Sequence, residues 1–286
     1  MKKTARILII AIFATGILSG CRMNLDTISN AFNSITEDFT PEQEHYLGRA
    51  VAAKIVQRYP AQKDNRANTY LNQLGQSLAL YSKQPFTYGG YHFLLLDSSE
   101  INAFAAPDGL IFVTTGMVGL VSGESELAAV LAHEIAHVQN KDAVSAIKAS
   151  RMTEVALLLG KEAVDQYAGG SSGAKLLNLF SESVDDIVNT LVSRGYSRNQ
   201  EYAADAEAKE ILSMAGYRPE ALDDVLRTME KQIPSGGTGL ISTHPPAADR
   251  LAAVKSASPP SGPKPGKELR DRRFKAALGK YSSPRR

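Results

Sequence analysis

The order of hydrophobic and polar positions predicts helices before and after a short β-rich segment. Residues 41–59 favour a helix that begins at Pro41, with acidic side chains in its first turn. Residues 65–82 place their leucines mostly on one side at helical spacing. Later helical patterns cover 122–138, 140–164, 175–193, 198–215, 219–232 and 246–256.

Three short apolar runs lie between these helices and have the composition of β-strands. They cover 91–97, 101–109 and 110–116, and the second ends in a Pro-Asp-Gly turn. The sequence therefore predicts an α+β fold that is predominantly helical and contains a small β-sheet.

Polar and flexible stretches mark the limits of the folded domain, which we expect to span 41–256. Residues 168–174 ("AGGSSGA") form either a mobile lid or a plain surface connection, and 233–246 is an irregular loop that contains His244. Residues 257–286 are rich in Pro, Gly and Ser and carry nine Lys/Arg against two Asp/Glu. We expect a basic, disordered tail there, either solvated or in contact with an acidic surface.

Residues 1–20 have the pattern of a lipoprotein signal peptide. A basic "MKKTAR" precedes an apolar stretch of twelve residues, too short to span a bilayer comfortably, and the stretch is followed by "SGC". This ending resembles a bacterial lipobox, in which Cys21 carries the lipid and 21–40 is the tether; a plain export signal is the alternative. An Asp directly after the lipidated Cys resembles an inner-membrane retention signal, but this chain has Arg22 there. The absence of an Asp favours the outer membrane of the bacterial cell envelope, facing the periplasm.

The composition excludes some classes of function. The net charge is only +2 and there is no Trp, which argues against nucleic acid as a partner. Cys21 is the only cysteine, which excludes an internal disulfide and a cysteine-ligated metal site, and acylation gives this thiol a purpose. The oligomeric state is not fixed by any of these features.

The helix predicted over 122–138, with Ser122 as its expected N-cap, contains the motif His-Glu-Ile-Ala-His. His133 and His137 are four residues apart, so on a helix they lie on one face and can share a metal ion. Glu134 could then act as a general base on a metal-bound water. The alternative is two histidines on an ordinary buried helix. However, the run is apolar nearly all round, and unpartnered imidazoles buried with a glutamate cost several kcal/mol.

Catalytic zinc normally has three protein ligands and one open position, so the motif needs a third ligand. No other histidine follows closely, and a Glu with an Asp four residues later is the other common solution, because the Asp can hold a ligand histidine. The candidate pairs are Glu182 with Asp186, Glu201 with Asp205, and Glu220 with Asp224. Spacing alone does not choose among them. Glu201 has the most favourable context, because small alanines in its helix permit close packing.

Together these motifs resemble a known family, the membrane-linked zinc peptidases that include HtpX, the type 1 CAAX prenyl endopeptidases and the mitochondrial Oma-type proteases. The chain is most similar to its bacterial lipoprotein and periplasmic, BepA-like branch. "HEIAH" and "EYAAD" resemble the ligand motifs, "NAFAAPDGLIFVTTGMV" (102–118) the Asn-Ala-Phe segment, and "STHPPAADRLAAV" (242–254) the His-Pro loop followed by an Arg. The resemblance implies a zincin-like metallopeptidase with the sheet beside the active-site helix.

The resemblance also implies a role for each matched residue. His133, His137 and Glu201 would bind one zinc ion per chain. Glu134 would be the catalytic general base. Asp205 would lie behind the ligands and hold His133 in place.

Further implied roles concern the substrate cleft. A peptide substrate would pair by main-chain hydrogen bonds with a strand that contains Asn102, Ala103 and Phe104. His244 would either stabilise the oxyanion during catalysis or bind zinc in a closed, inactive state. Arg250, and also Arg198, would support the His244 loop or the Glu201 helix by ion pairing.

We therefore expect a zinc metalloendopeptidase, anchored by lipid at Cys21, that cleaves misfolded or unassembled envelope proteins by attack of a zinc-bound water on the peptide carbonyl. The polypeptide substrate and its cleavage preference are not encoded in any motif. The rival interpretation is a binding or chaperone-like lipoprotein that keeps zinc for structure. A purely structural zinc site needs no general base, so Glu134 favours the enzyme.

Overall fold

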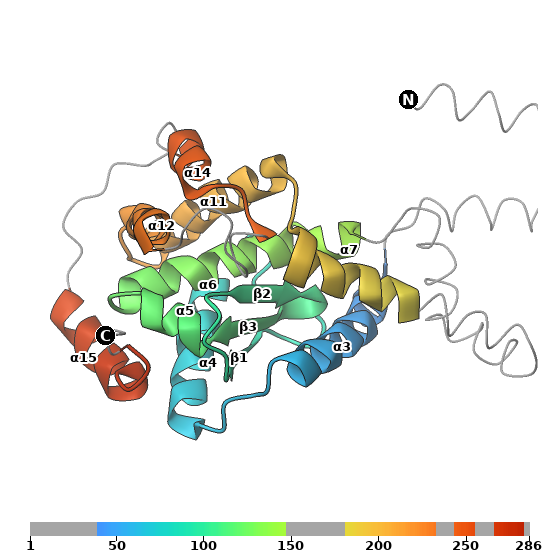
Figure 1. The fold of residues 1–286 in the computed structure, drawn as a ribbon, viewed down its shortest axis with the longest axis horizontal. Helices are drawn as coiled ribbons and strands as arrows, with labels where there is room; N and C mark the ends of the chain where they lie inside the picture. Colours follow the sequence, from blue (N-terminus) through green and yellow to red (C-terminus); the bar gives the residue numbers. More distant parts are fainter. Residues whose placement is uncertain (1–38, 147–180, 233–242, 255–265, 283–286) are drawn as a thin grey trace, which may run out of the picture. The chain divides into compact units, whose positions relative to one another are not determined.

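The computed structural model describes residues 39–146, 181–232, 243–254 and 266–282. Over these ranges it is predominantly helical with one three-stranded sheet, which confirms the predicted fold class (Figure 1). The predicted signal peptide, the lipidation site, nearly all of the tether and the 168–174 break lie outside the described residues.

The three apolar runs form the sheet, in the order β1-β3-β2. Strand β1 (His92–Leu96) pairs in parallel with β3 (Leu110–Thr114), and β2 (Ala103–Ala106) pairs antiparallel with β3. Strand β2 therefore lies at one edge of the sheet, and within the described part of the chain no further strand pairs with it.

The predicted Pro-Asp-Gly turn joins β2 to β3 and packs against helix α3 (Pro41–Arg58). Asp108 in this turn has a left-handed backbone, with φ of 62°. Gly48 of α3 lies so close that a Cβ atom there would be 2.2 Å from the Pro107 carbonyl oxygen. The glycine thus allows a direct helix–turn contact that holds one end of the edge strand in place.

The first two described helices begin where the sequence predicts. Thr40 caps α3 in a capping box with Gln43. Asp64 caps α4 (Asn65–Ala79) by accepting hydrogen bonds from two backbone N–H groups of its first turn. Helix α4 packs against β1, so its position also supports one edge of the sheet.

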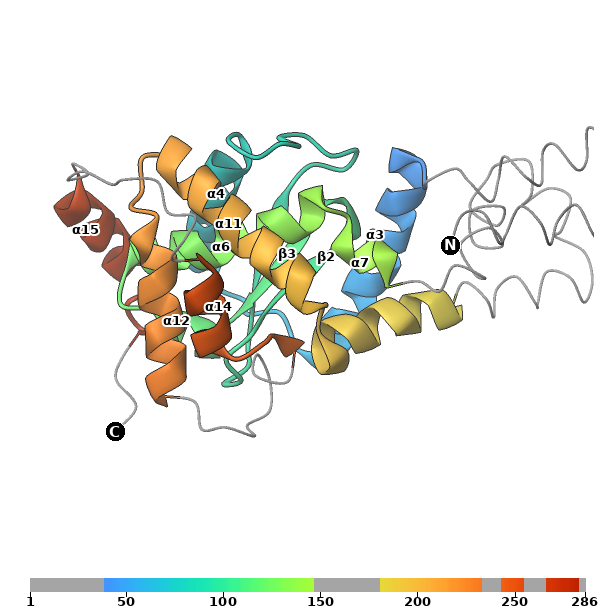
Figure 2. The same ribbon diagram turned by 90° about the horizontal axis from the view of Figure 1, so that it is seen from above.

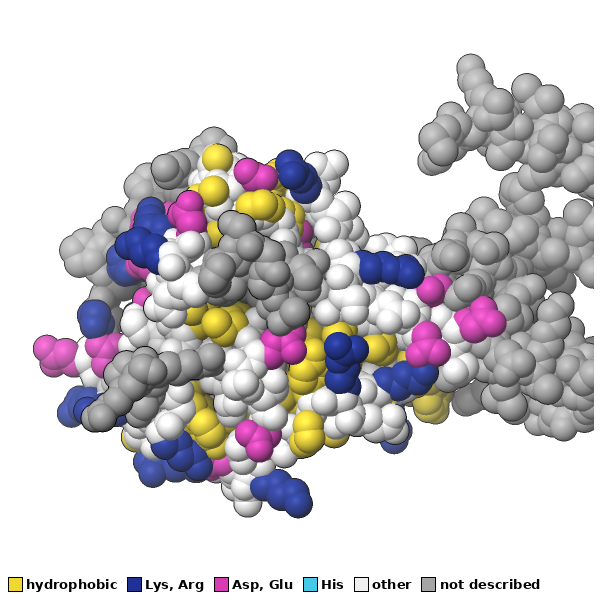
Figure 3. All heavy atoms as spheres, viewed as in Figure 1, with side chains coloured by type: hydrophobic (Ala, Val, Ile, Leu, Met, Phe, Trp, Pro, Cys, Tyr) yellow, Lys and Arg dark blue, Asp and Glu magenta, His cyan; other side chains and the backbone are white. Residues whose placement is uncertain are grey.

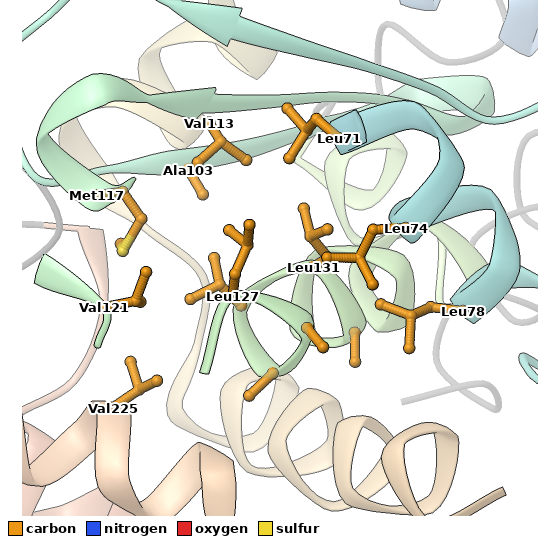
Figure 4. Close-up of a cluster of buried hydrophobic side chains, with 14 of the residues drawn as sticks. Leu71, Leu74, Leu78, Ala103, Val113, Met117, Val121, Leu127, Leu131 and Val225 are labelled. Atoms are coloured by element: carbon orange, nitrogen blue, oxygen red, sulfur yellow. The ribbon is translucent and has the colours of Figure 1, made fainter. Parts of the chain in front are cut away.

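Helix α6 (Glu124–Gln139) is the central element of the fold (Figures 1 and 2). It packs against β2, α4, α11 (Arg198–Met214) and α12 (Glu220–Gln232), and each of its residues from 127 to 138 is buried. Figure 4 shows the leucines of α6 and α4 meeting side chains of the sheet and α12. Each fully buried leucine contributes about 1.5–3 kcal/mol, so this helix is a rigid platform.

The N-terminus of α6 differs in detail from the prediction. The N-cap is Gly123, and Ser122 stands one position outside the helix. The cause is Glu126, whose carboxylate reaches back to accept hydrogen bonds from the backbone N–H and the hydroxyl of Ser122. The short helix α5 (Thr115–Leu120), which the sequence analysis missed, leads from β3 into this cap.

The prediction of continuous helix over 140–164 is wrong at its start. Helix α6 ends at Gln139, Lys141 takes a left-handed backbone conformation with φ of 55°, and α7 is only Asp142–Ser145. An ion pair between Lys141 and the buried Glu44 holds this reversal. Residues 147–164 lie outside the described part.

The predicted helix over 175–193 is helical where it is described, from residue 181, and ends in a π-helical turn, Thr190–Arg194. Helices α11 and α12 follow as expected. Helix α14 (Ala247–Val254) comes directly after the His244 segment.

The predicted disordered tail is wrong for residues 267–278, which form helix α15 (Lys267–Leu278). Phe274, Ala277 and Leu278 are buried, and the helix packs against α4 and α6. Their spacing of three and four residues is a helical signal that the low apolar content of the segment hid. The compact unit therefore extends past the expected boundary at 256 and includes α15.

Charged side chains of both signs are interspersed with hydrophobic ones on the face drawn in Figure 3. This mixture agrees with the small net charge of +2. Among the described residues, none of the helices has the length and apolar character needed to cross a bilayer.

Candidate metal centre

Helix α6 brings the two histidines of the motif together in the interior. His133 and His137 lie one turn apart on the same face, and they are 4% and 1% exposed. Their Nε2 atoms are 3.1 Å apart. The two histidines therefore lie on one face of the helix, as their spacing predicts.

Helix α11 adds the carboxylate of Glu201, which is fully buried. Its Oε2 lies 3.6 Å from His133 Nε2, and its Oε1 lies 3.6 Å from His137 Nε2. Oε1 has no hydrogen-bond partner among the described residues. Ligand atoms about 2.0–2.1 Å from a tetrahedral ion lie roughly 3.3–3.4 Å apart. The three side chains thus have the spacing and the unpaired acceptor that a zinc ion requires.

The other two carboxylate candidates lie elsewhere. Glu182 is on the exposed side of its helix, and Glu220 begins α12. The group of described residues whose donor atoms could share one ion is His133, His137, Glu201 and His244. Of the three Glu–Asp pairs left open by the sequence, the fold brings the middle one to the histidines.

His244 completes this group from the segment before α14. Its Nδ1 lies 2.7 Å from Glu201 Oε2, and the donor atoms of all four side chains are within 4.8 Å of one another. A glycine allows the approach: a Cβ at Gly195 would lie 1.7 Å from the Thr243 carbonyl oxygen. The chain entering α11 and the chain carrying His244 are therefore in backbone contact.

Asp205 and Arg250 form a buried pair behind His133. Asp205 Oδ1 lies 3.0 Å from His133 Nδ1, and the Arg250 Nε donates to Asp205 Oδ2 at 2.8 Å. Burial alone would raise the pKa of Asp205, but Arg250 and His133 lower it well below its ordinary value. A permanently charged Asp205 can fix the orientation of His133. Arg198, by contrast, pairs with Asp249 at 3.5 Å on the surface and does not reach the cluster.

Asp142 holds His137 in the same way, and the sequence analysis missed it. Its Oδ2 lies 2.7 Å from His137 Nδ1, and its Oδ1 accepts a hydrogen bond from Gln200 Nε2 at 2.8 Å. The left-handed turn at Lys141 folds Asp142 back toward the histidine. Only that reversal, which the local pattern did not reveal, makes the pairing possible.

The strong charges around Glu201 shape its acidity. Burial would raise the pKa of this carboxyl, but His244, His133 and Arg250 lower it far below the ordinary range. Glu201 is therefore an anion, as a metal ligand must be.

Glu134 is 3% exposed and lines two cavities beside the cluster. The first lies between β2, where Phe104 contributes, and the His244 segment. The second is mainly apolar, with Met117 of α5 and Val225 of α12 in its wall. Glu134 and His244 are the residues that line both cavities.

The predicted substrate strand lies partly where expected. Ala103 and Phe104 belong to β2 and line the first cavity. The Asn102 side chain instead turns to its own backbone, because its Oδ1 accepts from the Ala103 N–H at 3.0 Å and its Nδ2 donates to Glu100. Asn102 thus fixes the start of the strand.

Tyr196 is a further residue of the site that the sequence analysis missed. Its ring lies 4.4 Å from the His137 ring, measured between centroids, and its side chain lines the first cavity. Its hydroxyl is buried without a hydrogen-bond partner among the described residues, which costs about 1–3 kcal/mol. Burial and the nearby Glu134 raise the pKa of Tyr196 well above that of free tyrosine, so the hydroxyl keeps its proton.

Comparison with known proteins agrees with this geometry. The model of "Peptidase family M48" matches residues 65–258, which include the whole cluster and end before α15. The chain is 29% identical to a "Protease HtpX homolog" of Salinibacter ruber over 56% of this chain and 66% of that protein. It is 24% identical to the "Beta-barrel assembly-enhancing protease" of Escherichia coli over 81% of this chain but only 47% of that protein. "Metalloprotease LoiP" of Escherichia coli is 25% identical over 87% of this chain and 95% of its own length.

Proposed function

The chain belongs to peptidase family M48, and from this premise we propose that it is a zinc-dependent metalloendopeptidase. The observation that carries the proposal is the buried cluster of His133, His137 and Glu201, with an unpaired Glu201 oxygen, next to Glu134 in a cavity. The relatives named as proteases support the same conclusion, although the chain spans only 66% and 47% of two of them.

The proposed ligands are His133, His137 and Glu201, with Asp205 and Asp142 orienting the two imidazoles. Bound zinc would supply Lewis acidity toward the peptide carbonyl and would lower the pKa of water. The chemistry of the donor set, two imidazoles and one carboxylate, is that of known catalytic zinc sites.

Glu134 would act as the general base and then as the general acid. It does not belong to the donor group, yet it lines both cavities beside the cluster. We propose that it takes a proton from the attacking water and later gives it to the leaving amine. Such a base contributes about 10²–10⁴-fold to the rate.

The edge strand β2 would hold the substrate. Its partner on one side is β3, and within the described residues no strand pairs with its other edge. An extended peptide could add there as a further strand through main-chain hydrogen bonds, with Ala103 and Phe104 beside it. Asn102 would act by fixing the start of this strand.

The predicted roles for His244 were an oxyanion donor and a fourth ligand that keeps the enzyme latent. The 2.7 Å contact with Glu201 and the membership of His244 in the four-residue group favour the latent state. His244→Ala would then raise the rate of cleavage without loss of zinc. A fall in the rate would instead support the oxyanion role.

For the biological substrate we propose misfolded or unassembled proteins of the bacterial envelope. Unfolded chains expose extended backbone, and the site offers an edge strand with which it can pair. A relative whose name is "Beta-barrel assembly-enhancing protease" supports this class of substrate. The lipobox-like sequence at Cys21 supports an anchor in the outer membrane, facing the periplasm.

The anchor has its own test. Cells that express the full chain would be fed a radiolabelled fatty acid, and the label should appear on the protein and be absent from Cys21→Ala. If both forms carry no label and both pellet with membranes, the anchor is not a lipid on this cysteine.

The enzyme is tested by casein cleavage with the full, zinc-loaded chain in detergent. Glu134→Gln should keep zinc and the folded state but lose cleavage by about 10²–10⁴-fold. Glu126→Gln, eight residues earlier on the same helix, is the matched control and should cleave as the wild type does. A wild type that binds zinc but cleaves nothing, even as His244→Ala, would favour the chaperone-like rival.

A further inference from the structure

Tyr196 offers a chemical group that the roles assigned so far do not use. It lies in the link between the π-helical turn and α11, one residue before Ser197, which caps α11 in a capping box with Gln200. The tyrosine is therefore tied to the start of the helix that carries Glu201.

Two contacts position Tyr196. Its ring packs on the imidazole of His137, at 4.4 Å between centroids and 35° between planes. Gly195, directly before it, is in backbone contact with Thr243. The ring thus packs on a metal-ligand candidate, and the residue before it contacts the segment that carries His244.

The Tyr196 side chain lines the cavity next to the candidate metal centre. Its hydroxyl is buried, it has no hydrogen-bond partner among the described residues, and the cavity also contains Glu134 and Phe104 of the edge strand. Buried hydroxyls normally find a partner, so an orphan one next to a reaction site needs an explanation. A carbonyl oxygen of a peptide that lies along β2 would supply the missing acceptor.

We propose that the Tyr196 hydroxyl is the hydrogen-bond donor for the oxyanion of the tetrahedral intermediate in peptide cleavage. This inference rests on the proposed function. As water adds to the carbonyl carbon, the π electrons of the C=O bond move to its oxygen and Glu134 takes the proton of the water. The Tyr196 O–H donates a hydrogen bond to that oxygen and keeps its own proton.

His244 is less suited to this task in the structure described here. Its Nδ1 is already 2.7 Å from Glu201 Oε2, so that atom is engaged with the metal-ligand group. Tyr196 has no such commitment. The two residues border the same cavity, which explains why both must be tested in parallel.

The test uses Tyr196→Phe in the full, zinc-loaded chain in detergent, because the phenylalanine ring keeps the contact with His137. The rate constant kcat for a peptide substrate should fall by about 10²–10³-fold, the loss typical of one oxyanion donor, with KM and zinc content unchanged. The second readout is the inhibition constant of a phosphinic peptide, whose anionic oxygens imitate the tetrahedral oxyanion. Its binding should weaken by about the same factor as kcat/KM.

Tyr217→Phe is the matched control, because it removes another buried tyrosine hydroxyl, one that contacts Glu124. It should leave kcat and inhibitor binding unchanged. A Tyr196→Phe enzyme within threefold of the wild type in both readouts would overturn the proposal, as would loss of zinc, which would make Tyr196 a support for His137. A wild type that cleaves nothing but binds zinc would instead overturn the proposed function, while the phosphinic peptide would still report on Tyr196.

Discussion

The two ends of helix α6 each bury a carboxylate, but they treat it in opposite ways. Near the N-terminus, Glu124 is fully buried, and near the C-terminal half the fully buried Glu201 of α11 faces His133 and His137. Both carboxylates are surrounded by polar groups from distant parts of the chain. The difference lies in whether those groups satisfy every oxygen.

The Glu124 end is closed. Tyr70 donates a hydrogen bond to its Oε2 and Tyr217 to its Oε1, each at 2.8 Å, and Arg273 of α15 pairs with both oxygens. Burial and the Glu124 carboxylate raise the pKa of Tyr217 to about 12, so its hydroxyl remains a donor at neutral pH. Nothing further is needed to balance this charge.

The Glu201 end is open. One oxygen has no hydrogen-bond partner among the described residues, and two histidines have aspartates on the far side of their rings. A closed set of partners stabilises a fold, and an open set of donor atoms around a shared point requires a cation. What distinguishes the Glu201 end is therefore an unpaired carboxylate oxygen within a group of four possible metal donors, and not burial or charge.

The largest expected effect is on zinc itself. Glu201→Gln should reduce zinc from about one per chain to near zero after purification without chelators. Loss of a ligand should lower the zinc affinity by more than the roughly 10–100-fold that is typical when a residue that only orients a ligand is lost. Glu182→Gln and Glu220→Gln are matched controls and should keep zinc. Metal analysis decides the matter: retention in Glu201→Gln, with loss in either control, would place the third ligand on another helix.

Substitutions at the Glu124 end should lower the free energy of unfolding and leave the zinc content unchanged. Glu124→Ala leaves the hydroxyls of Tyr70 and Tyr217 unpaired in the interior, and the free energy of unfolding should fall by about 3 kcal/mol. Arg273 adds less, because its side chain is 48% exposed and screened by water. Urea unfolding would measure the change.

The matched control for Glu124→Ala is Glu126→Ala in the same turn, where the lost partner is only the exposed Ser122. Its free energy of unfolding should change by less than about 1 kcal/mol. If Glu124→Ala also removed zinc, the two ends of α6 would be coupled and the separation argued above would not hold.

A smaller effect is expected from the outer partners of the open end. Asp142→Asn removes the negative charge 2.7 Å from His137 Nδ1, and zinc affinity should fall by about 10–100-fold with little change in stability. Asp249→Asn, at an exposed ion pair with Arg198, is the control and should leave zinc affinity unchanged. Competition with a fluorescent chelator would measure both, and equal affinities would show that Asp142 does not act through His137.

Local signals explain which parts of the fold were predictable. Pro41, the apolar runs of the sheet and the His-Glu-x-x-His spacing each act within one element, so the sequence reveals them directly. The choice of Glu201 needed context, namely the small residues that let α11 approach α6. Such context is still a property of one helix.

The missed features depend on residues that are far apart in the chain. Glu124 meets partners 54, 93 and 149 residues away, and no periodicity in the sequence reports such contacts. The contact of Asp142 with His137 depends on the reversal at Lys141. The proposed role of Tyr196 depends on a hydroxyl that has no hydrogen-bond partner among the described residues. These are consequences of tertiary packing, which local propensity does not determine.

A third carboxylate, Asp64, contacts the C-terminal segment just beyond α15. Asp64 caps α4 through Oδ1 and pairs through Oδ2 with the exposed Lys280, at 2.7 Å, just beyond α15. Asp64→Asn keeps the capping oxygen but removes the charge, so the free energy of unfolding at neutral pH should fall by less than it does in Glu124→Ala.

The pH dependence of stability reports on the charge of Asp64. The hydrogen bond from Lys280, with that from the Ala67 backbone, lowers the pKa of Asp64 to about 2. A lowered pKa in the folded state gives stability that is present above the unfolded value of 3.8 and is lost as the pH falls toward 2. Urea midpoints of the zinc-free protein should therefore converge between wild type and Asp64→Asn as the pH drops through this window. A constant difference at all pH values would mean that the substitution does not act through the charge of Asp64.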